Sequence, residues 1–346
     1  MVGATPNIAT RQPPQSAARV GAVPEATNPG TDTPEEWAAH VDHAGTSRRE
    51  NFIVMSPLLP RRLRPGFAAV YAFCRTADDL ADEQGATPEA RTRALSLLAS
   101  FRRSLHACFA CNPREPLFTK LATTIKQHNL PIEPFDRLLD AFEQDQHVTR
   151  YETWDQLIDY STRSADPVGR LVLMLAGCDI DPVEQSSEVA RQSDAICTAL
   201  QLVNFWQDVR RDLIERDRVY LPATDTGLTA DWLRTNLDTP SPDARAQYRE
   251  ALQPLVAKAR DLIAEGEDLP RLVPKDIAAP IWLFVEAARR TAAAIERADC
   301  ATLWQRPTVR TPARLAMLAG ATRVRLVGAG RSSTTASVRS QGAPHA

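Results

Sequence analysis

The chain has 346 residues, of which 43% are hydrophobic, 24% charged and 6% aromatic, a composition typical of a globular protein with a sizeable core. Lysine and arginine number 41 against 43 aspartates and glutamates, so the chain has no general attraction to nucleic acid or anionic lipid. Six cysteines with no secretory leader before them predict reduced thiols in a cytosolic protein. The apolar stretches at 67–74 and 171–177 are far shorter than the roughly 20 residues that cross a bilayer, which argues against an integral membrane protein.

The ends of the chain differ in composition from its middle. Residues 1–45 open with a proline-rich stretch that has no apolar run, and residues 328–346 are mostly Gly, Ser, Thr and Ala. Such segments cannot bury enough apolar surface to offset the entropy lost on ordering. We therefore expect a disordered leader over 1–45 and a flexible tail over 328–346. Short connections and no internal repeat predict a single domain over 46–327.

Apolar residues recur at spacings of three and four through this domain, and the alternating valine, isoleucine and threonine runs of strands are nearly absent. The predicted fold class is therefore all-α. Several segments begin with a proline in the first turn, where its missing N–H costs nothing. In chain order, the predicted helices are 65–83, 88–110, 116–128, 131–146, 154–164, 167–178, 184–214, 242–267, 280–297 and 312–324.

Two of the predicted helices carry a polar stripe on an otherwise apolar segment. At 3.6 residues per turn, positions four or three apart fall on one face. The stripe on the helix over 65–83 consists of Tyr71, Arg75, Asp78 and Asp82. The stripe on the helix over 184–214 consists of Gln201, Asn204, Asp208 and Asp212.

Each stripe contains an Asp-x-x-x-Asp pair and no histidine. Oxygen donors of this kind suit Mg²⁺, which shares its coordination with waters and a phosphorylated substrate, so the stripes predict a magnesium-bridged diphosphate site. The alternative is that both are solvated helix faces with i,i+4 charge spacing. Bulky apolar residues over 70–73 and 202–206 surround the stripes, and a buried carboxylate needs a partner or a metal. Together the two stripes favour a functional site over two solvated helix faces.

Four motifs follow one another along the chain from about residue 50 to 325. They are Glu50-Asn51-Phe52 with Leu58-Leu59-Pro60, Tyr71-x-Phe-x-Arg75-x-x-Asp78-Asp79-x-x-Asp82, Tyr160-x-x-x-Ser164-Ala-Asp166-Pro167-Val-Gly169-Arg170, and Gln201-x-x-Asn204-Phe-Trp-Gln-Asp208-x-x-x-Asp212 with Arg218-Val-Tyr220-Leu-Pro222. In these motifs and their separations the chain resembles the squalene and phytoene synthase family of head-to-head prenyl transferases. Within the family it is most similar to the bacterial hydroxysqualene synthases.

The resemblance implies an isoprenoid synthase fold, a helical bundle whose two aspartate-rich helices face each other across a central cavity. It implies Mg²⁺ as cofactor, with the metal ligands Asp78, Asp82, Asn204, Asp208 and Asp212. Catalytic roles would fall to Asp78, Asp82, Asp208, Asp212, Tyr71 and Tyr160. Substrate binding would fall to Arg75, Gln201, Asn204, Arg218 and Tyr220. For Arg75 the alternative is a structural ion pair with a neighbouring aspartate, and for Tyr160 a core aromatic whose hydroxyl is satisfied.

The reaction implied by the resemblance is Mg²⁺-dependent ionisation of presqualene diphosphate, rearrangement and capture of one water. Its products would be hydroxysqualene and diphosphate, in squalene and hopanoid biosynthesis. The sibling reaction is head-to-head condensation of two prenyl diphosphates to presqualene diphosphate, squalene or phytoene. A non-catalytic helical binding protein is the third hypothesis, and the presence of all four aspartates argues against it.

Polyprenyl substrates also imply a membrane nearby. The basic segment 310–325 either rests on a bilayer surface or packs on the core as an ordinary terminal helix. The resemblance implies a cytoplasmic protein with peripheral contact at the inner face of the cytoplasmic membrane, and coupling to a presqualene diphosphate synthase and a hydroxysqualene-reducing flavoenzyme. Two positions depart from the subgroup's pattern, because Asp166 stands where asparagine is usual and Ala288 where tyrosine is common.

Overall fold

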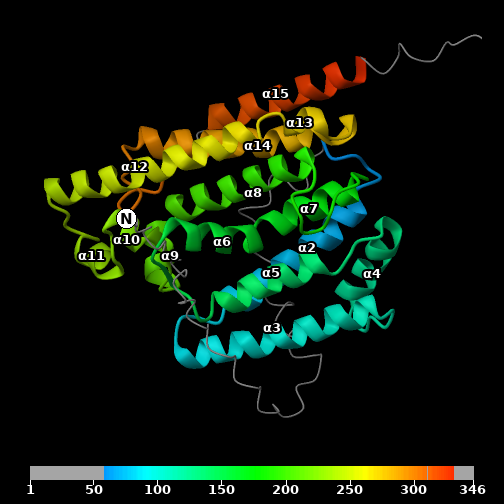
Figure 1. Cartoon of the computed structure of the whole chain (residues 1–346), viewed down its shortest axis with the longest axis horizontal. Helices are drawn as coiled ribbons and strands as arrows, with labels where there is room; N and C mark the ends of the chain where they lie inside the picture. Colours follow the sequence, from blue (N-terminus) through cyan, green and yellow to red (C-terminus); the bar gives the residue numbers. More distant parts are fainter. Residues whose placement is uncertain (1–57, 310, 331–346) are drawn as a thin grey trace, which may run out of the picture. The chain divides into compact units, whose positions relative to one another are not determined.

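The computed structural model describes residues 58–309 and 311–330, where the regular structure is almost entirely helical (Figure 1). The helices are α2 (Arg64–Asp82), α3 (Pro88–Phe109), α4 (Pro116–His128), α5 (Glu133–Gln144), α6 (Trp154–Ser164), α7 (Asp166–Leu175), α8 (Glu188–Gln207), α9 (Val209–Glu215), α10 (Ala223–Thr226), α11 (Ala230–Thr235), α12 (Pro242–Glu265), α13 (Leu269–Leu272), α14 (Lys275–Arg297) and α15 (Thr311–Gly330). Two short strands, β1 (Arg150–Tyr151) and β2 (Val219–Pro222), pair in parallel. The all-α prediction is confirmed.

Helices α4 and α6 begin and end where the sequence predicts, and other boundaries differ. Helix α14 begins at Lys275, so Pro280 lies inside the helix and not at its start. Helix α15 ends at Gly330, within the segment 328–346. Residues 1–57, with the predicted leader 1–45 and the motif Glu50-Asn51-Phe52, lie outside the part of the chain that the structure describes, as do residues 310 and 331–346.

The helix predicted over 184–214 is wrong as a single element, because it is interrupted at Asp208. The backbone of this residue has φ −109° and ψ 14°, which separates α8 from α9. Its N–H is shared between the carbonyls of Asn204 and Phe205, at 3.0 and 3.2 Å. The stripe from Gln201 to Asp212 therefore spans a helix end and the start of the next helix.

Helix α2 is positioned by a hydrophobic cluster that it shares with α3, α4, α5 and α7. Pro65 lies in its first turn. Phe73 is fully buried, and its ring centroid lies 5.1 Å from those of Phe101 and Phe135. Because apolar residues fix one face of α2 in this cluster, the opposite face, with Arg75 and Asp78, is left partly exposed.

Helix α8 belongs to a second cluster, with α6, α12 and α14 around it (Figure 1). Ser187 caps its first turn, because the hydroxyl accepts the N–H of Ala190 at 3.2 Å. Trp206 is fully buried and donates its indole N–H to the carbonyl of Tyr220 on β2 at 3.1 Å. Leu200 packs against both clusters. The stripe on α2 is therefore positioned by the first hydrophobic cluster and the stripe on α8 by the second, and the two clusters meet at Leu200.

Helix α15 packs on α14. Ala321 and Met317 are buried there, and Gly320 lies so close to the ring of Trp282 that a Cβ would clash with it. These contacts agree with the expectation of a terminal helix packed on the core. None of the described helices is both long enough and apolar enough to span a membrane.

A buried ion pair joins α7 to α8. The guanidinium of Arg170 donates two hydrogen bonds to the carboxylate of Asp194, at 2.8 and 2.6 Å, and two more to the carbonyls of Asp181 and Glu184. Both charged side chains are almost fully buried. The α7–α8 connection is therefore tied to the helices on both sides of it.

Replacing Arg170 by methionine should reduce the free energy of unfolding by about 3 to 5 kcal/mol, because Asp194 is left as an uncompensated buried charge. Denaturant unfolding followed by circular dichroism measures this difference. The control is Arg163→Met, which breaks an exposed pair with Asp159 on α6 and should cost no more than about 1 kcal/mol. Equal losses in the two variants would contradict the prediction.

Candidate active site

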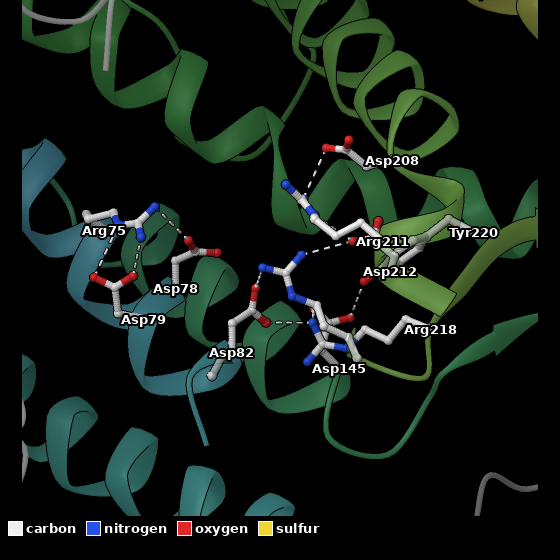
Figure 2. A network of polar contacts seen from close by, with 12 residues as sticks. Arg75, Asp78, Asp79, Asp82, Asp145, Asp208, Arg211, Asp212, Arg218 and Tyr220 are labelled. Carbon is white, nitrogen blue, oxygen red and sulfur yellow. Dashed lines mark hydrogen bonds and ion pairs between the residues drawn. The ribbon is translucent and has the colours of Figure 1, made fainter. Parts of the chain in front are cut away.

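The stripe on α2 places Arg75 against two aspartates (Figure 2). Its guanidinium forms a two-pronged pair with Asp79, at 2.6 and 3.1 Å, and lies 3.5 Å from a carboxylate oxygen of Asp78. The expected alternative for Arg75, an ion pair with a neighbouring aspartate, is therefore present in the structure. Asp78 keeps a more weakly neutralised carboxylate, whose side chain is 44% exposed.

Asp82 lies one turn further along α2 and faces the segment after α9. Two arginines of that segment reach it, Arg216 at 2.9 Å and Arg218 at 2.7 Å. Arg216 also contacts Asp212 of α9 at 2.9 Å. The guanidinium of Arg216 therefore joins the two aspartate stripes, which lie more than a hundred residues apart in the sequence. Figure 2 shows Asp82 of one stripe and Asp212 of the other facing each other.

The aspartates of the second stripe are less exposed than those of the first. Asp208 and Asp212 are both buried. Asp208 pairs with Arg306, from the loop before α15, and with Arg211 at 3.1 Å. Burial raises the pKa of Asp212, and the nearby charges of Arg211 and Arg216 act against this rise. Each of these carboxylates is thus compensated by guanidinium groups.

A third carboxylate, Asp145, lies directly after α5 and is buried. It accepts hydrogen bonds from the hydroxyls of Tyr160, at 2.8 Å, and Tyr220, at 3.4 Å. Arg218 lies 3.5 Å from it and so connects Asp145 to Asp82. Burial raises the pKa of Asp145 to about 6 although Arg218 opposes the shift.

Aromatic rings pack around this carboxylate. Phe205 and Tyr220 stack with centroids 3.7 Å apart and planes 7° apart. Tyr160 stacks on both, at 6.0 and 5.8 Å, and Tyr151 completes the group. Burial, followed by the charge of Asp145, raises the pKa of the Tyr160 hydroxyl well above its usual value. The hydroxyl therefore stays protonated and donates to Asp145, so the expected alternative for Tyr160, a satisfied core aromatic, also describes its contacts.

The remaining predicted residues lie on α2 and α8. Gln201 is half-buried on α8, and its amide lies 3.5 Å from the hydroxyl of Ser164. Asn204 has an exposed side chain at the end of α8, and Tyr71 is half-buried on α2. Asp166, one of the two departures, is buried at the start of α7 and accepts a hydrogen bond from Thr198 at 2.8 Å.

The other departure, Ala288, is fully buried in α14 within the cluster around α8. A short side chain there fits the close packing of α14 on α8. The side chains of Asp166 and Ala288 therefore both lie in packed interior positions.

The oxygen donors of the two stripes fit a hard cation in kind. Burial, reinforced by the charge of Asp82, raises the pKa of Asp78 to about 7, so negative charge is under-compensated there. Within residues 58–309 and 311–330 no three carboxylate, imidazole or thiol groups gather closely enough to hold a metal. Guanidinium groups lie between the carboxylates instead, as Figure 2 shows.

A hollow of about 240 Å³ opens beside the second stripe. Its lining includes Asp208, Arg211 and Arg306, together with Gln207 and Thr302. The ion pairs of Asp208 are therefore accessible to a small polar ligand from this side.

The sequence itself decides the family. Residues 46–314 match the family model described as squalene/phytoene synthase. The chain belongs to the squalene/phytoene synthase family. It is therefore an enzyme of that class, and the family resemblance inferred from its four motifs is confirmed.

The chain is similar to three members of the squalene/phytoene synthase family over different shares of its length. A hydroxysqualene synthase of Zymomonas mobilis subsp. mobilis is 39% identical over 177 residues, which are 50% of this chain and 55% of that relative. A phytoene synthase of Arthrospira platensis is 29% identical over 273 residues, 76% of this chain and 84% of the relative. The crystal structure of squalene synthase HpnC from Alicyclobacillus acidocaldarius has a TM-score of 0.64 and 38% identity, and the match covers 77% of this chain and 95% of that one.

The structural match confirms the fold. The three matches cover different shares of the proteins concerned. The chain spans only about half the length of the Zymomonas relative, but most of the other two proteins. The squalene/phytoene synthase fold is thus shared over nearly the whole of a solved structure.

Four residues of this squalene/phytoene synthase were missed by the sequence analysis, namely Asp145, Arg211, Arg216 and Arg306. Arg211 and Arg216 lie within the fourth motif or just after its Asp212, and helical spacing alone could have placed Arg216 one turn after Asp212. Asp145 lies at the end of the helix predicted over 131–146, directly after α5, and Arg306 lies in the connection between α14 and α15. Only the tertiary structure brings these two to the site.

Proposed function

We propose that this enzyme ionises presqualene diphosphate and directs capture of one water, giving hydroxysqualene and diphosphate. The observation that carries the proposal is the bridge from Asp82 through Arg216 to Asp212, which places the two aspartate stripes face to face. The names of the relatives at 38% and 39% identity support the squalene branch of the family.

The proposed cofactor is Mg²⁺, held by oxygens of Asp78, Asp82, Asn204, Asp208 and Asp212. Bound there, it would neutralise charge that builds on the leaving diphosphate. Asp78 fits this role best among the described carboxylates of α2, because its side chain is 44% exposed and its pairing with Arg75, at 3.5 Å, is loose. A dication bound there would offset the repulsion between Asp78 and Asp82.

The arginines of the site supply the donors for the diphosphate. Arg216 and Arg218 lie between the two stripes and hold Asp82, and a guanidinium presents its N–H groups in the fork geometry that phosphate oxygens match. Arg75, half-buried on α2, adds a third fork on the other side of Asp78. We assign these three residues to binding and orienting the diphosphate.

The aromatic rings beside Asp145 would shield the carbocation that ionisation of the diphosphate leaves behind from stray water. The stacked rings of Tyr160, Phe205 and Tyr220 present faces of negative potential and exclude stray water. The Tyr160 hydroxyl keeps its proton directed at Oδ2 of Asp145, so the ring is held in one orientation. Tyr71 and Gln201 are assigned to the cavity wall near the departing diphosphate.

The second candidate function is head-to-head condensation of two prenyl diphosphates. Its support is the phytoene synthase relative, which is 29% identical over 76% of this chain. Both candidates use the same aspartates and differ in whether a water or a second prenyl chain reaches the cation.

Product analysis distinguishes the two. The purified protein is incubated with presqualene diphosphate and Mg²⁺ in ¹⁸O-labelled water, without NADPH, and the products are identified by mass spectrometry. Hydroxysqualene carrying ¹⁸O is the expected result. Unchanged presqualene diphosphate, from a preparation that converts farnesyl or geranylgeranyl diphosphate, would contradict the proposal and support condensation.

The proposal extends to the enzyme's surroundings. A presqualene diphosphate synthase would supply the substrate, and a hydroxysqualene-reducing flavoenzyme would consume the product. We propose a cytoplasmic enzyme with peripheral contact at the inner face of the membrane, because both substrate and product are long apolar chains. Sedimentation with liposomes of membrane lipid tests this contact.

A further inference from the structure

The segment between α9 and β2 makes a sharp turn at Asp217. This residue has φ +53°, in the left-handed region that few residues other than Gly, Asn and Asp adopt. The flanking Arg216 and Arg218 both reach Asp82 on α2. The side chain of Asp217 instead meets arginines of other elements, so the turn directs successive side chains to different partners.

These other partners hold the Asp217 carboxylate firmly. Arg150 of β1 donates to its Oδ1 at 2.5 Å and, through its other nitrogen, to the carbonyl of Asp217. Arg234 of α11 pairs with the same Oδ1, and Arg91 of α3 lies 3.8 Å from Oδ2. We call the contacts of Asp217 with Arg150 and Arg234 the Asp217 clamp.

The backbone on either side of the turn is fixed as well. The carbonyl of Asp212 accepts the N–H groups of Arg216 and Arg218, at 3.2 and 2.9 Å. The N–H of Val219 donates to the carbonyl of Thr149 at 2.9 Å, where β2 pairs with β1. Backbone hydrogen bonds fix this turn against α9 and β1, and the Asp217 clamp adds side-chain contacts at the turn itself.

We propose that Asp217 is a positioning residue for diphosphate binding. Its carboxylate contacts neither of the aspartate stripes, and it acts by fixing the turn that holds Arg216 and Arg218 between them. This inference rests on the proposed function of those two arginines. Asp217 is 42% exposed, so it lies outside the core and its replacement leaves the hydrophobic clusters intact.

The test compares Asp217→Asn and Asp217→Gly with a matched control. Both variants tolerate a left-handed backbone, but both remove the charge that holds Arg150. The control is Asp299→Asn, because Asp299, directly after α14, also has φ +53° and pairs with one arginine, Arg249 of α12, at 2.9 Å. The readouts are kcat/KM for prenyl diphosphates, the affinity for inorganic pyrophosphate with Mg²⁺ by calorimetry, and the thermal midpoint.

We expect both Asp217 variants to lose about 10- to 100-fold in kcat/KM, the scale of small misplacements of binding groups. Pyrophosphate affinity should fall with it, while thermal midpoints stay close to that of Asp299→Asn. Arg150→Gln should give a similar loss, and combining it with Asp217→Asn should add little, because both break the same clamp. Arg150→Lys should lose less than Arg150→Gln, because it keeps the charge.

Two results would overturn the inference. One is an active wild type whose Asp217 variants match Asp299→Asn in kcat/KM and pyrophosphate affinity. The other is full additivity of Arg150→Gln and Asp217→Asn, which would mean that they act separately. A wild type that turns over no prenyl diphosphate would instead overturn the proposed function. Pyrophosphate affinity then decides the inference alone, and equal affinities of wild type and Asp217→Gly overturn it.

Discussion

Replacing Asp78 by asparagine is expected to lower the turnover of prenyl diphosphates by about a hundred- to a thousandfold, the scale seen when one electrostatic group is lost from an active site. The amide has nearly the same size, so packing changes little. What disappears is the most exposed charge of the α2 stripe, which has Arg75 at 3.5 Å and is also opposed by the charge of Arg216. Steady-state release of inorganic diphosphate measures the effect.

Stability should respond in the opposite sense to activity. Burial and the charge of Asp82 raise the pKa of Asp78 to about 7, so removing the charge relieves repulsion in the free protein. We therefore expect an unchanged or higher thermal midpoint for Asp78→Asn without Mg²⁺. Adding Mg²⁺ with pyrophosphate should raise the midpoint of the wild type and not that of the variant, because a ligand stabilises only the form that binds it.

The control for this prediction is Asp140→Asn, which breaks an exposed carboxylate pair with Arg102 between α3 and α5. It should retain both turnover and the midpoint shift with Mg²⁺ and pyrophosphate. If Asp78→Asn also retained both, the assignment of the α2 stripe to metal binding would be wrong.

Helix positions were predictable because local signals and packing agree. Pro116 opens α4 and Asn129, at φ +50°, closes it, so the residues that begin and end the helix are visible in the sequence. The interruption at Asp208 was not predictable, because the apolar spacing continues through it. At the break, the Asp208 carboxylate pairs with Arg306, about a hundred residues later, and no local pattern encodes that contact.

The aspartates of the site were predictable, and their partners were not. Asp78 and Asp82 share a helical face, so their proximity follows from 3.6 residues per turn. The contact of Asp82 with Arg216 and Arg218 depends on how the two clusters meet and on the left-handed turn at Asp217. No local pattern encodes such a meeting, since it is fixed by tertiary packing.

Replacing Asp145 by asparagine is expected to lower activity without lowering stability at pH 7. Asp145→Asn removes the charge that accepts hydrogen bonds from Tyr160 and Tyr220 and lies 3.5 Å from Arg218. Since Arg218 and the two rings then lose a fixed partner, we expect kcat to fall by about 10- to 100-fold. Presteady-state and steady-state diphosphate release measure this loss.

The pH dependence of stability identifies the same carboxylate. Burial raises the pKa of Asp145 to about 6 in the folded protein, above the value near 3.9 of an unfolded aspartate. Between these values the folded state binds more protons than the unfolded state, so this group's contribution to stability decreases as the pH rises. The wild type should therefore lose about 2 kcal/mol relative to Asp145→Asn between pH 4 and pH 7.

Denaturant unfolding of both proteins at pH 4, 5, 6 and 7 measures the difference. Near pH 7 the difference should level off, because Asp145 is then mostly ionised in both states. A variant that is less active than the wild type at pH 7 and equally or more stable there identifies Asp145 as a carboxylate retained for function at a cost in stability. A difference in stability that stays constant from pH 4 to pH 7 would mean that Asp145 is ionised throughout, because its pairing with Arg218 outweighs its burial.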